Sequence, residues 1–207
     1  MVITYLGRSY FKITLGDLTI AINPPSKSLK PARFGADIAL ITTRVPACND
    51  AETVALGDKV PFVIDGPGSY EVRDIFIAGA ESKVVIDGKT HINTVYGFEL
   101  DNIKIGFMGL ISDETTLSSE AKEILGNADM VFVPLGGNDT FDPATAYKVA
   151  TSYDVNVLIP YEYDSASLSR FLKEGGQEKN ESAEKATLKR KDLDGKEGYI
   201  MVLDAQG

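Results

Sequence analysis

The first half of the chain alternates short runs of β-branched and other apolar residues with polar breaks rich in Gly, Asp and Asn. Runs of this length and composition predict β-strands. Gly16-Asp17 and Asp101-Asn102 are typical of tight turns between neighbouring strands. This half therefore predicts a mostly antiparallel sheet. The expected strands are Val2–Leu6, Phe11–Thr14, Leu18–Ile22, Ile38–Ile41, Phe62–Asp65, Val72–Ala78, Thr94–Leu100 and Ile103–Met108.

After about residue 115 helical patterns alternate with buried apolar runs. Ser118 is a typical N-cap for a helix that runs through Leu125 and ends at Gly126. Asp142-Pro143 predicts the start of a second helix, through about Ser152, because proline fits the first helical position. A third amphipathic helix is expected over Ser165–Lys173. In the first half of the chain, Asp50 is a candidate cap for a short helix that follows it, Ala51–Leu56. Further strands are expected at Met130–Pro134, Val155–Pro160, Ala186–Arg190 and Tyr199–Leu203.

This order of elements predicts a fold class. A β-meander followed by β-α-β-α units and terminal strands suggests two packed sheets with helices outside them, an α/β four-layer αββα sandwich. The length and the 43% hydrophobic content suffice for one core, and we expect residues 1–207 to form a single domain.

The composition of the chain excludes some classes of partner and indicates a cellular compartment. Lys and Arg number 21 against 30 Asp and Glu, which gives a formal charge of −9, so we expect no nucleic-acid partner and no attraction to anionic membranes. The basic cluster Lys185–Lys191 is expected to be a solvated strand end. No apolar run approaches the roughly 18 to 20 residues of a membrane span, and no leader pattern is present. Cys48 is the only cysteine, as a reducing compartment permits, so we expect a cytoplasmic protein.

Histidine is nearly absent from the chain. The single histidine, His91, lies in Asp87–His91, which we expect to be a solvated turn. One imidazole cannot build a zinc site, which needs three or four converging protein donors. A nucleophilic role for Cys48 would need a nearby base or cation, for which only His91 and Arg44 are candidates. We expect Cys48 to be a quiet, buried thiol.

Several segments, in register along nearly the whole chain, resemble consecutive elements of the metallo-β-lactamase fold superfamily, in particular its small Zn-dependent hydrolase-like branch. The resemblance implies the αββα sandwich and, for an intact member, a divalent metal held mainly by imidazoles and carboxylates. The segments are Ile3–Ser9, Leu18–Pro24, Ala36–Thr42, Phe62–Val72, Asn93–Tyr96, Val133–Gly137 and Leu158–Pro160.

The same resemblance identifies the positions where the family places its metal ligands. The family cluster reads His-x-His-x-Asp-His after a Leu-Ile-Thr strand end, a bridging aspartate follows later, and a last histidine comes near the end. Valine, alanine and leucine cannot bind a metal, so the resemblance implies a fold without the family's metal centre, with no cofactor and no family catalytic residue. The corresponding residues of this chain are Thr43, Val45, Ala47, Cys48, Leu110 and Glu162.

Two interpretations remain open. The first is a catalytically degenerate protein with a binding, scaffold or regulatory role toward an unknown protein or small-molecule partner, with the former ligand positions lining the cleft. A homo-oligomer is one form that it could take, and an apolar patch on the first sheet would indicate it. The polar residues expected in the cleft are Arg8, Asn23, Asp50 and Asn138.

The second interpretation is a hydrolase of a small ester, amide, lactone or phosphodiester. Its remodelled cleft would use Arg8, Cys48, Asp50 and Glu162. Carboxylates at Asp50, Asp113, Glu114 and Glu162 could hold Mg²⁺ or Ca²⁺, which prefer oxygen donors. A filled former metal cavity would favour the first interpretation, and an open polar one would favour ligand binding.

Overall fold

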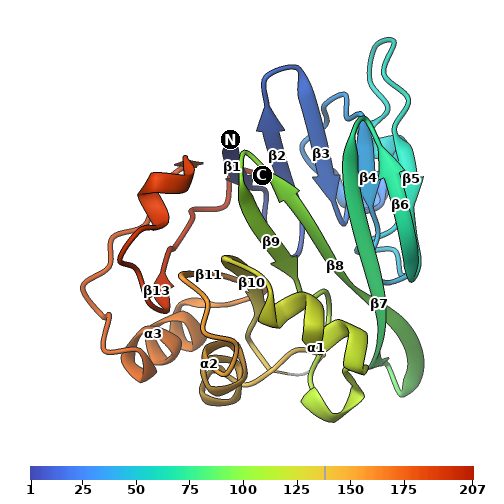
Figure 1. Ribbon diagram of the computed structural model, residues 1–207. Coiled ribbons are helices and arrows are strands. Elements are labelled where there is room, and N and C mark those ends of the chain that lie inside the picture. Colours follow the sequence, from blue (N-terminus) through green and yellow to red (C-terminus); the bar gives the residue numbers. More distant parts are fainter. Residues whose placement is uncertain (138) are drawn as a thin grey trace.

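The computed structural model, which describes residues 1–137 and 139–207, consists of two β-sheets packed face to face (Figure 1). The six-stranded first sheet has the strand order β12-β1-β2-β3-β4-β5, and the seven-stranded second sheet has the order β13-β11-β10-β9-β8-β7-β6. Both sheets are mixed, since β3–β4–β5 and β9–β10–β11–β13 are parallel and the other neighbours are antiparallel.

The strands of the first sheet are β1 (Val2–Tyr5), β2 (Phe11–Leu15), β3 (Leu18–Ile22), β4 (Ile38–Leu40), β5 (Phe62–Ile64) and β12 (Ala186–Thr187). Those of the second sheet are β6 (Gly68–Val72), β7 (Ile75–Ile86), β8 (Lys89–Leu100), β9 (Ile103–Phe107), β10 (Met130–Pro134), β11 (Val157–Tyr161) and β13 (Tyr199–Ile200). The helices are α1 (Ser119–Gly126), α2 (Pro143–Thr151) and α3 (Ser165–Glu174), with the short 3₁₀ helices η1 (Lys27–Leu29), η2 (Ala51–Val54), η3 (Glu114–Thr116) and η4 (Arg190–Leu193).

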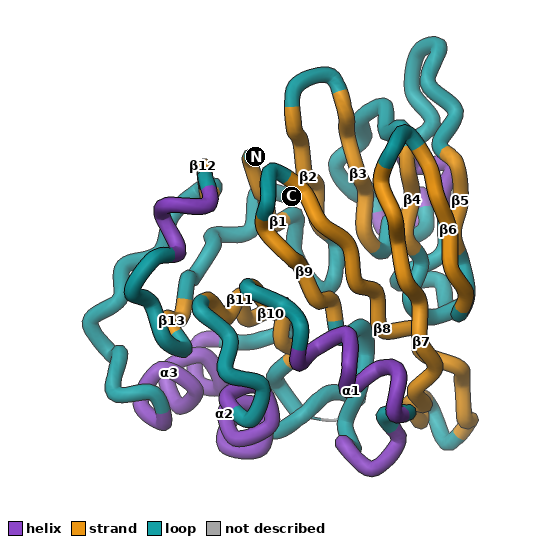
Figure 2. Tube along the Cα trace, viewed as in Figure 1, coloured by secondary structure: helices purple, strands orange, loops and turns teal. Residues whose placement is uncertain are grey.

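The three α-helices cover the outer face of the second sheet (Figure 2). The starts of α1 and α2 follow the sequence signals: Ser118 caps α1, and Asp142 caps α2 with Pro143 in its first turn. On α3, Asp164 forms a capping box with Ser167, a cap that was not predicted. The outer layer of the first sheet is thinner. There Val54 of η2 packs with Ala21 and Ala39 of the sheet. The αββα sandwich is confirmed, with one outer layer reduced to 3₁₀ helix and loop.

The main core lies between the sheets. Phe11, Phe107, Phe132 and Tyr161 are fully buried there and contact one another, with Phe11 edge-on to Phe132 at 4.9 Å and Phe107 stacked on Tyr161 at 5.0 Å between ring centroids. Rings in these geometries add about 0.5–1.5 kcal/mol per pair beyond their buried area. The second core layer lies beneath the helices.

The β7/β8 hairpin is longer than the sequence predicts. The strand expected at Val72–Ala78 is wrong at its start, because Val72 ends β6 and the Arg73-Asp74 turn separates it from β7. From Ile75, β7 runs on to Ile86, and the strand expected at Thr94–Leu100 already starts at Lys89. The turn between β7 and β8 is Asp87-Gly88, both with positive φ. His91 therefore lies within β8, opposite Val84, and its prediction as a turn residue was wrong. The extension arises because alternate side chains of Gly79–Ile86 are buried, which is the two-residue period of a β-strand. The polar residues in this segment hide that period in the sequence.

Besides the last strand, expected at Tyr199–Leu203 but ending at Ile200, two other predicted elements are shorter in the structure. The helix expected at Ala51–Leu56 is a single 3₁₀ turn ending at Val54. The strand expected at Ala186–Arg190 ends at Thr187, and Arg190 instead starts η4, where its guanidinium pairs with Asp129 at 2.6 Å. In both places a 3₁₀ turn satisfies the hydrogen bonds of the backbone within a few residues. The α-helix therefore does not propagate in the first case, and strand pairing ends early in the second.

Candidate functional site

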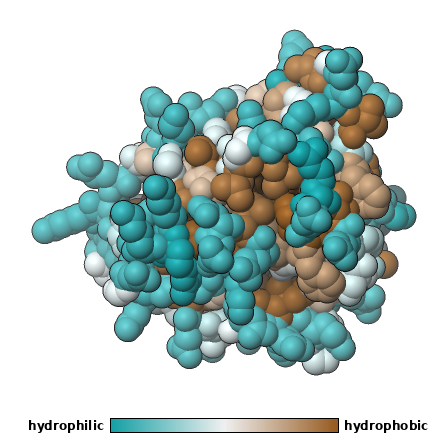
Figure 3. All heavy atoms as spheres, turned by 45° about the horizontal axis from the view of Figure 1, so that its top comes forward, coloured by the Kyte–Doolittle hydropathy of each residue, from teal (hydrophilic) through white to brown (hydrophobic). Residues whose placement is uncertain are grey.

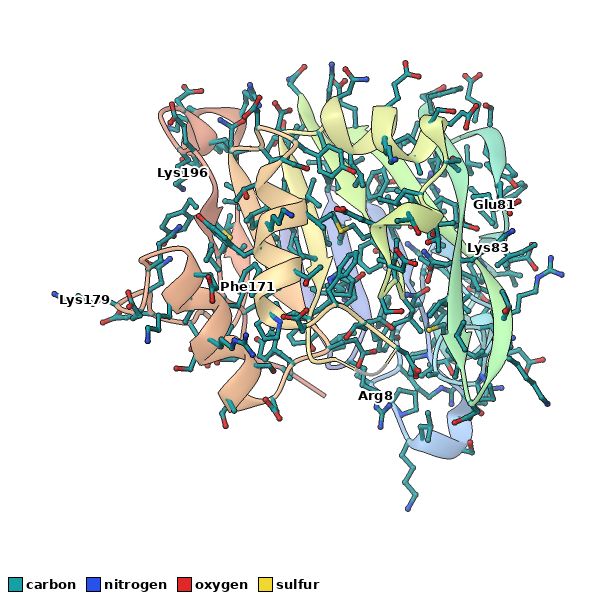
Figure 4. The ribbon with its side chains drawn as sticks, turned by 90° about the horizontal axis from the view of Figure 1, so that it is seen from below. Arg8, Glu81, Lys83, Phe171, Lys179 and Lys196 are labelled. Atoms are coloured by element: carbon teal, nitrogen blue, oxygen red, sulfur yellow. The ribbon has the colours of Figure 1, made fainter. Side chains whose placement is uncertain are left out.

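The loops that follow β1, β3, β4, β9, β10 and β11 lie at one end of the sandwich, together with the tip of the β7/β8 hairpin. Figure 4 looks onto the helices that cover the second sheet, with Arg8 toward the lower edge and Glu81 and Lys83 on β7 to the right. Parallel strands bring their carboxyl ends to the same edge of a sheet, and ligand sites of α/β folds form at such edges. The candidate site is therefore this end of the molecule.

Most of the positions aligned with family metal ligands form an apolar cluster. Cys48 and Leu110 are buried and pack with Val84 of the β7/β8 hairpin, and Val45 and Ala47 are partly buried against them. Ile86, also from the hairpin, closes the cluster. Over residues 1–137 and 139–207 no group of three or more His, Cys, Asp or Glu side chains is placed to hold a metal ion. Four of the aligned positions therefore hold hydrocarbon side chains and one thiol.

Asn93 organises the polar side of the site. Its Oδ1 accepts hydrogen bonds from Thr43 Oγ1 at 3.1 Å and from the Leu110 amide at 2.9 Å. Its Nδ2 donates to Ser82 Oγ at 2.7 Å and to the Met108 carbonyl at 2.8 Å. Thus one fully buried amide joins the loop after β4 to the loop after β9 and to β7. Thr43, an aligned ligand position, serves here as a hydrogen-bond donor within the scaffold.

The Cys48 thiol is chemically quiet. It is fully buried, and the Ser9 hydroxyl lies 3.5 Å from its sulfur. Burial raises the pKa of the Cys48 thiol to about 12, because the thiolate would have to leave water. His91 is on the β8 strand, and Arg44 pairs with Asp65 at 2.9 Å on the surface. A thiol with this pKa is almost entirely protonated near neutral pH, which leaves it a poor nucleophile.

Glu162 follows β11 in a left-handed backbone conformation, with φ of 57°. Burial raises the pKa of its carboxyl, and the charge of Arg8 and the hydroxyl of Ser9 lower it in part. Gly136 makes room for this turn, since a Cβ there would collide with the Glu162 carbonyl oxygen. Arg8, itself left-handed with φ of 52°, has an exposed side chain. The two residues bring opposite charges to the same part of the candidate site.

The remaining candidates have local structural roles. Asn23 is fully buried and its Oδ1 accepts from the Thr42 amide at 2.8 Å, which holds β3 to the end of β4. Asp50 caps η2 as expected, accepting from the Glu52 amide at 3.2 Å, and also accepts from the Lys27 amide at 3.0 Å. Asp113 caps η3 in the same way. Asn138 lies outside the described residues.

Several residues at this end of the molecule have left-handed backbone. Arg8, Asn23 and Glu162 all have φ above 50°, and Gly109, with φ of 73°, follows β9. A Cβ at Gly109 would also collide with Asn93 Oδ1. Non-glycine residues in this region cost on the order of 1–3 kcal/mol each. The same conformation occurs at the opposite end, in the β6/β7 and β8/β9 turns, so it is not specific to the site.

Sequence reasoning missed the residues that fill and support the site. Val84 and Ile86 were missed because the hairpin was predicted too short. Asn93 was noted only as part of a family-like segment, although a lone amide within an apolar strand could have marked a buried hydrogen-bonding role. Tyr161, whose hydroxyl donates to the Gly109 carbonyl at 2.5 Å, followed an expected strand and carried no separate signal.

The fold and this site geometry define a protein of the metallo-β-lactamase class. Residues 2–162 match the Beta-lactamase superfamily domain, and the chain belongs to that family. It is 25% identical to a UPF0173 metal-dependent hydrolase of Thermococcus onnurineus strain NA1, over 79% of this chain and 84% of the relative.

Solved structures agree on the fold. The structure described as a Zn-dependent hydrolase of the metallo-β-lactamase superfamily from Thermotoga maritima superposes with a TM-score of 0.74 at 24% identity, covering 98% of this chain and 99% of the other. A metal-dependent hydrolase structure from Parabacteroides distasonis ATCC 8503 gives 0.69 at 16% identity, with 99% and 93% covered. These likenesses show the αββα fold.

In the part of the chain that the structure describes, none of the helices has the length and apolar character needed to span a membrane.

Proposed function

We propose that this chain is a catalytically degenerate member of its family that has lost the metal centre and acts as a binding, scaffold or regulatory protein. One observation carries the proposal: Val45, Ala47, Cys48 and Leu110 pack with Val84 into an apolar cluster at the family's ligand positions. Function depends on the site and not on the fold. A cluster whose one potential donor is a buried, protonated thiol has no means of polarising a substrate or activating water.

The donor set does not fit a catalytic divalent metal. Such a site takes three protein ligands drawn from imidazole, thiolate and carboxylate, arranged around one point. Of the six aligned positions, only Cys48 and Glu162 carry side chains of that kind. The Cys48 thiol has its pKa raised to about 12 by burial, so the thiolate that would bind a metal is disfavoured.

The rival interpretation, a hydrolase with a remodelled cleft, has less support. Two of its four residues have other roles, because Cys48 is a buried protonated thiol and Asp50 caps η2. Asp113 and Glu114 lie exposed at η3, where Asp113 caps the 3₁₀ turn. Arg8 and Glu162 remain as a polar pair of side chains without a nucleophile between them. They suit recognition of a polar group on a ligand.

Metal analysis tests the proposal directly. The protein should be produced with a tag that contains no histidine, purified without chelator, and analysed for zinc, iron and manganese by mass spectrometry. We expect far less than one metal per chain, also after incubation with added metal and desalting. The Thermotoga maritima relative, prepared identically, is the matched control. One tightly held equivalent of any of these metals would overturn the proposal.

An activity screen separates the two interpretations. Chromogenic esters, lactones and phosphodiesters should not be hydrolysed above background, with or without added Mg²⁺ or Mn²⁺. Saturable turnover that is lost in Glu162→Gln would instead support the remodelled hydrolase.

Two further parts of the proposal concern the cellular location of the protein and its domain organisation. The single buried thiol, Cys48, supports a cytoplasmic protein. We further infer that residues 1–207 act as one domain, since the two cores lie on the two faces of the second sheet and share it.

A further inference from the structure

Strand β5 is a free edge of the first sheet. It pairs with β4 on one side, and in the described part of the chain no strand lies on its other side. It is the outermost strand of that sheet at the right of Figures 1 and 2. A free edge presents backbone donors and acceptors to any strand that can approach it.

The pairing with β4 decides which backbone groups of β5 are free. The Phe62 amide donates to the Asp37 carbonyl at 2.8 Å, and the Ile64 carbonyl accepts from the Ile41 amide at 2.8 Å. In a parallel ladder alternate residues of a strand bond to the same neighbour. The amide and carbonyl of Val63 therefore point away from β4, toward the open edge.

Apolar side chains surround this edge. Among the described residues, eight large apolar side chains are exposed, and four of them lie within eight residues: Leu56 at 47%, Val60 at 83%, Phe62 at 52% and Val63 at 43%. Figure 3 shows apolar side chains at the upper right, where the loop before β5 projects in Figure 1. A concentration of exposed apolar residues at an unpaired strand marks an interaction surface.

We propose that a second copy of this chain pairs with β5 in antiparallel fashion, about a two-fold axis at Val63. The Val63 amide of each copy then donates to the Val63 carbonyl of the other, and the Asp65 amide of each faces the Pro61 carbonyl of the other. Each copy of β5 thus offers its free amide and carbonyl groups to the same groups of the other copy, as a two-fold interface requires. The proposal does not depend on the function of the candidate site.

Charge permits this occupant. The charged residue nearest the start of β5 is Lys59, and the one nearest its end is Asp65. Both of these charges are already paired within the chain, Lys59 with Asp37 at 2.7 Å and Asp65 with Arg44 at 2.9 Å. Between Val60 and Ile64 there is no charged side chain that would oppose its own copy. A second copy therefore brings no like charge against this stretch and covers its apolar side chains with apolar surface.

Sedimentation equilibrium over micromolar to millimolar concentrations tests the proposal with variants at Val63. We expect the unmodified chain to form a dimer. Val63→Pro removes the outward amide without removing a bond to β4, and Val63→Lys adds like charge at the axis; each should weaken dimerisation at least about tenfold. Val85→Lys, at an exposed position on β7, is the control and should dimerise like the unmodified chain. Circular dichroism confirms folding of each variant.

Cysteine cross-linking tests the register. Residues facing each other across the axis as a hydrogen-bonded pair would have Cα atoms about 5.5 Å apart, within disulfide range. Val63→Cys should therefore form a disulfide dimer rapidly under mild oxidation, whereas Val85→Cys should not. Native Cys48 is buried, so we expect it to form no disulfide between copies in this experiment.

A chain that stays monomeric at every concentration overturns the proposal. So does a dimer that persists undiminished in both Val63→Pro and Val63→Lys, or one that cross-links equally through Val63→Cys and Val85→Cys.

Discussion

Asn93 is the residue on which the geometry of the candidate site depends. Its amide makes four hydrogen bonds, to Thr43, Leu110, Ser82 and Met108, and it is fully buried. Each buried partner would lose its hydrogen bond if the amide were removed, and an orphaned buried group costs about 1–3 kcal/mol. The residue thus cross-links the loops after β4 and β9 by hydrogen bonds.

Asn93→Ala should lower the free energy of unfolding by about 3 kcal/mol or more, because several buried groups lose their partner at once. Urea unfolding followed by circular dichroism measures it. The control is Asn127→Ala, since Asn127 is exposed and its Nδ2 makes one hydrogen bond, to the Glu123 carbonyl; it should change stability by less than about 1 kcal/mol. Equal effects of the two substitutions would contradict the role assigned to Asn93.

The packing of α1 on the second sheet is decided by a glycine. Gly97 of β8 lies beneath Ile124 of α1, and a Cβ at this glycine would stand 2.6 Å from Ile124 Cγ2. The absence of a side chain lets the helix approach the strand closely, which positions the elements that follow α1. Gly97 does not have a positive φ, so its role is steric and not conformational.

Gly97→Ala should destabilise the protein by about 1–3 kcal/mol, because the added methyl group overpacks the α1–β8 contact. Ile124→Val should recover part of this loss in the double variant by removing a methyl group, and a double-mutant cycle in urea measures the coupling. Gly66→Ala is the matched control, since a Cβ at Gly66 meets nothing within 4 Å. Strictly additive effects of Gly97→Ala and Ile124→Val would show that the contact is not the cause.

At the scale of the whole molecule, Asp37 ties the two sheets together at the end opposite the candidate site. Its carboxylate accepts from the Thr19 amide at 2.8 Å and pairs with Lys59 at 2.7 Å, both on the side of the first sheet. It also pairs with Arg73, in the β6/β7 turn of the second sheet, at 3.1 Å. Although burial opposes the charge, these hydrogen bonds and cations lower the pKa of the Asp37 carboxyl.

This lowered pKa predicts a pH dependence. The stabilisation by Asp37 is complete above the pKa of the unfolded chain, about 3.9, and is lost as pH falls through the lower pKa of the folded state. Asp37→Asn should therefore cost about 1–3 kcal/mol near pH 7 and progressively less below pH 4. Thermal and urea unfolding across this range measure it.

Asp17→Asn is the control for the same experiment. Asp17 is 92% exposed and pairs only with Arg73, so its loss should change stability by less than about 1 kcal/mol at any pH. A penalty for Asp37→Asn that does not shrink in acid would contradict the assignment.

The sequence by itself determined the strand-rich first half, the three helices with the caps of the first two, and the residue types at the positions aligned with the family's metal ligands. These features are local: a cap, a run of β-branched residues or a valine at an aligned position can be read without knowing its neighbours in space. The sequence also predicted Asp50 as a cap and Cys48 as a quiet thiol, because turn chemistry and the lack of a nearby base are evident along the chain.

Only the tertiary structure decided which side chains pack together at the aligned ligand positions. Val84 and Ile86 reach it from a hairpin whose length depends on pairing between β7 and β8, and pairing is a property of two strands at once. The role of Asn93 and the open edge at Val63 likewise depend on which segments become neighbours. Burial and hydrogen-bond partners arise from contacts between distant residues, so no local pattern along the chain contains them.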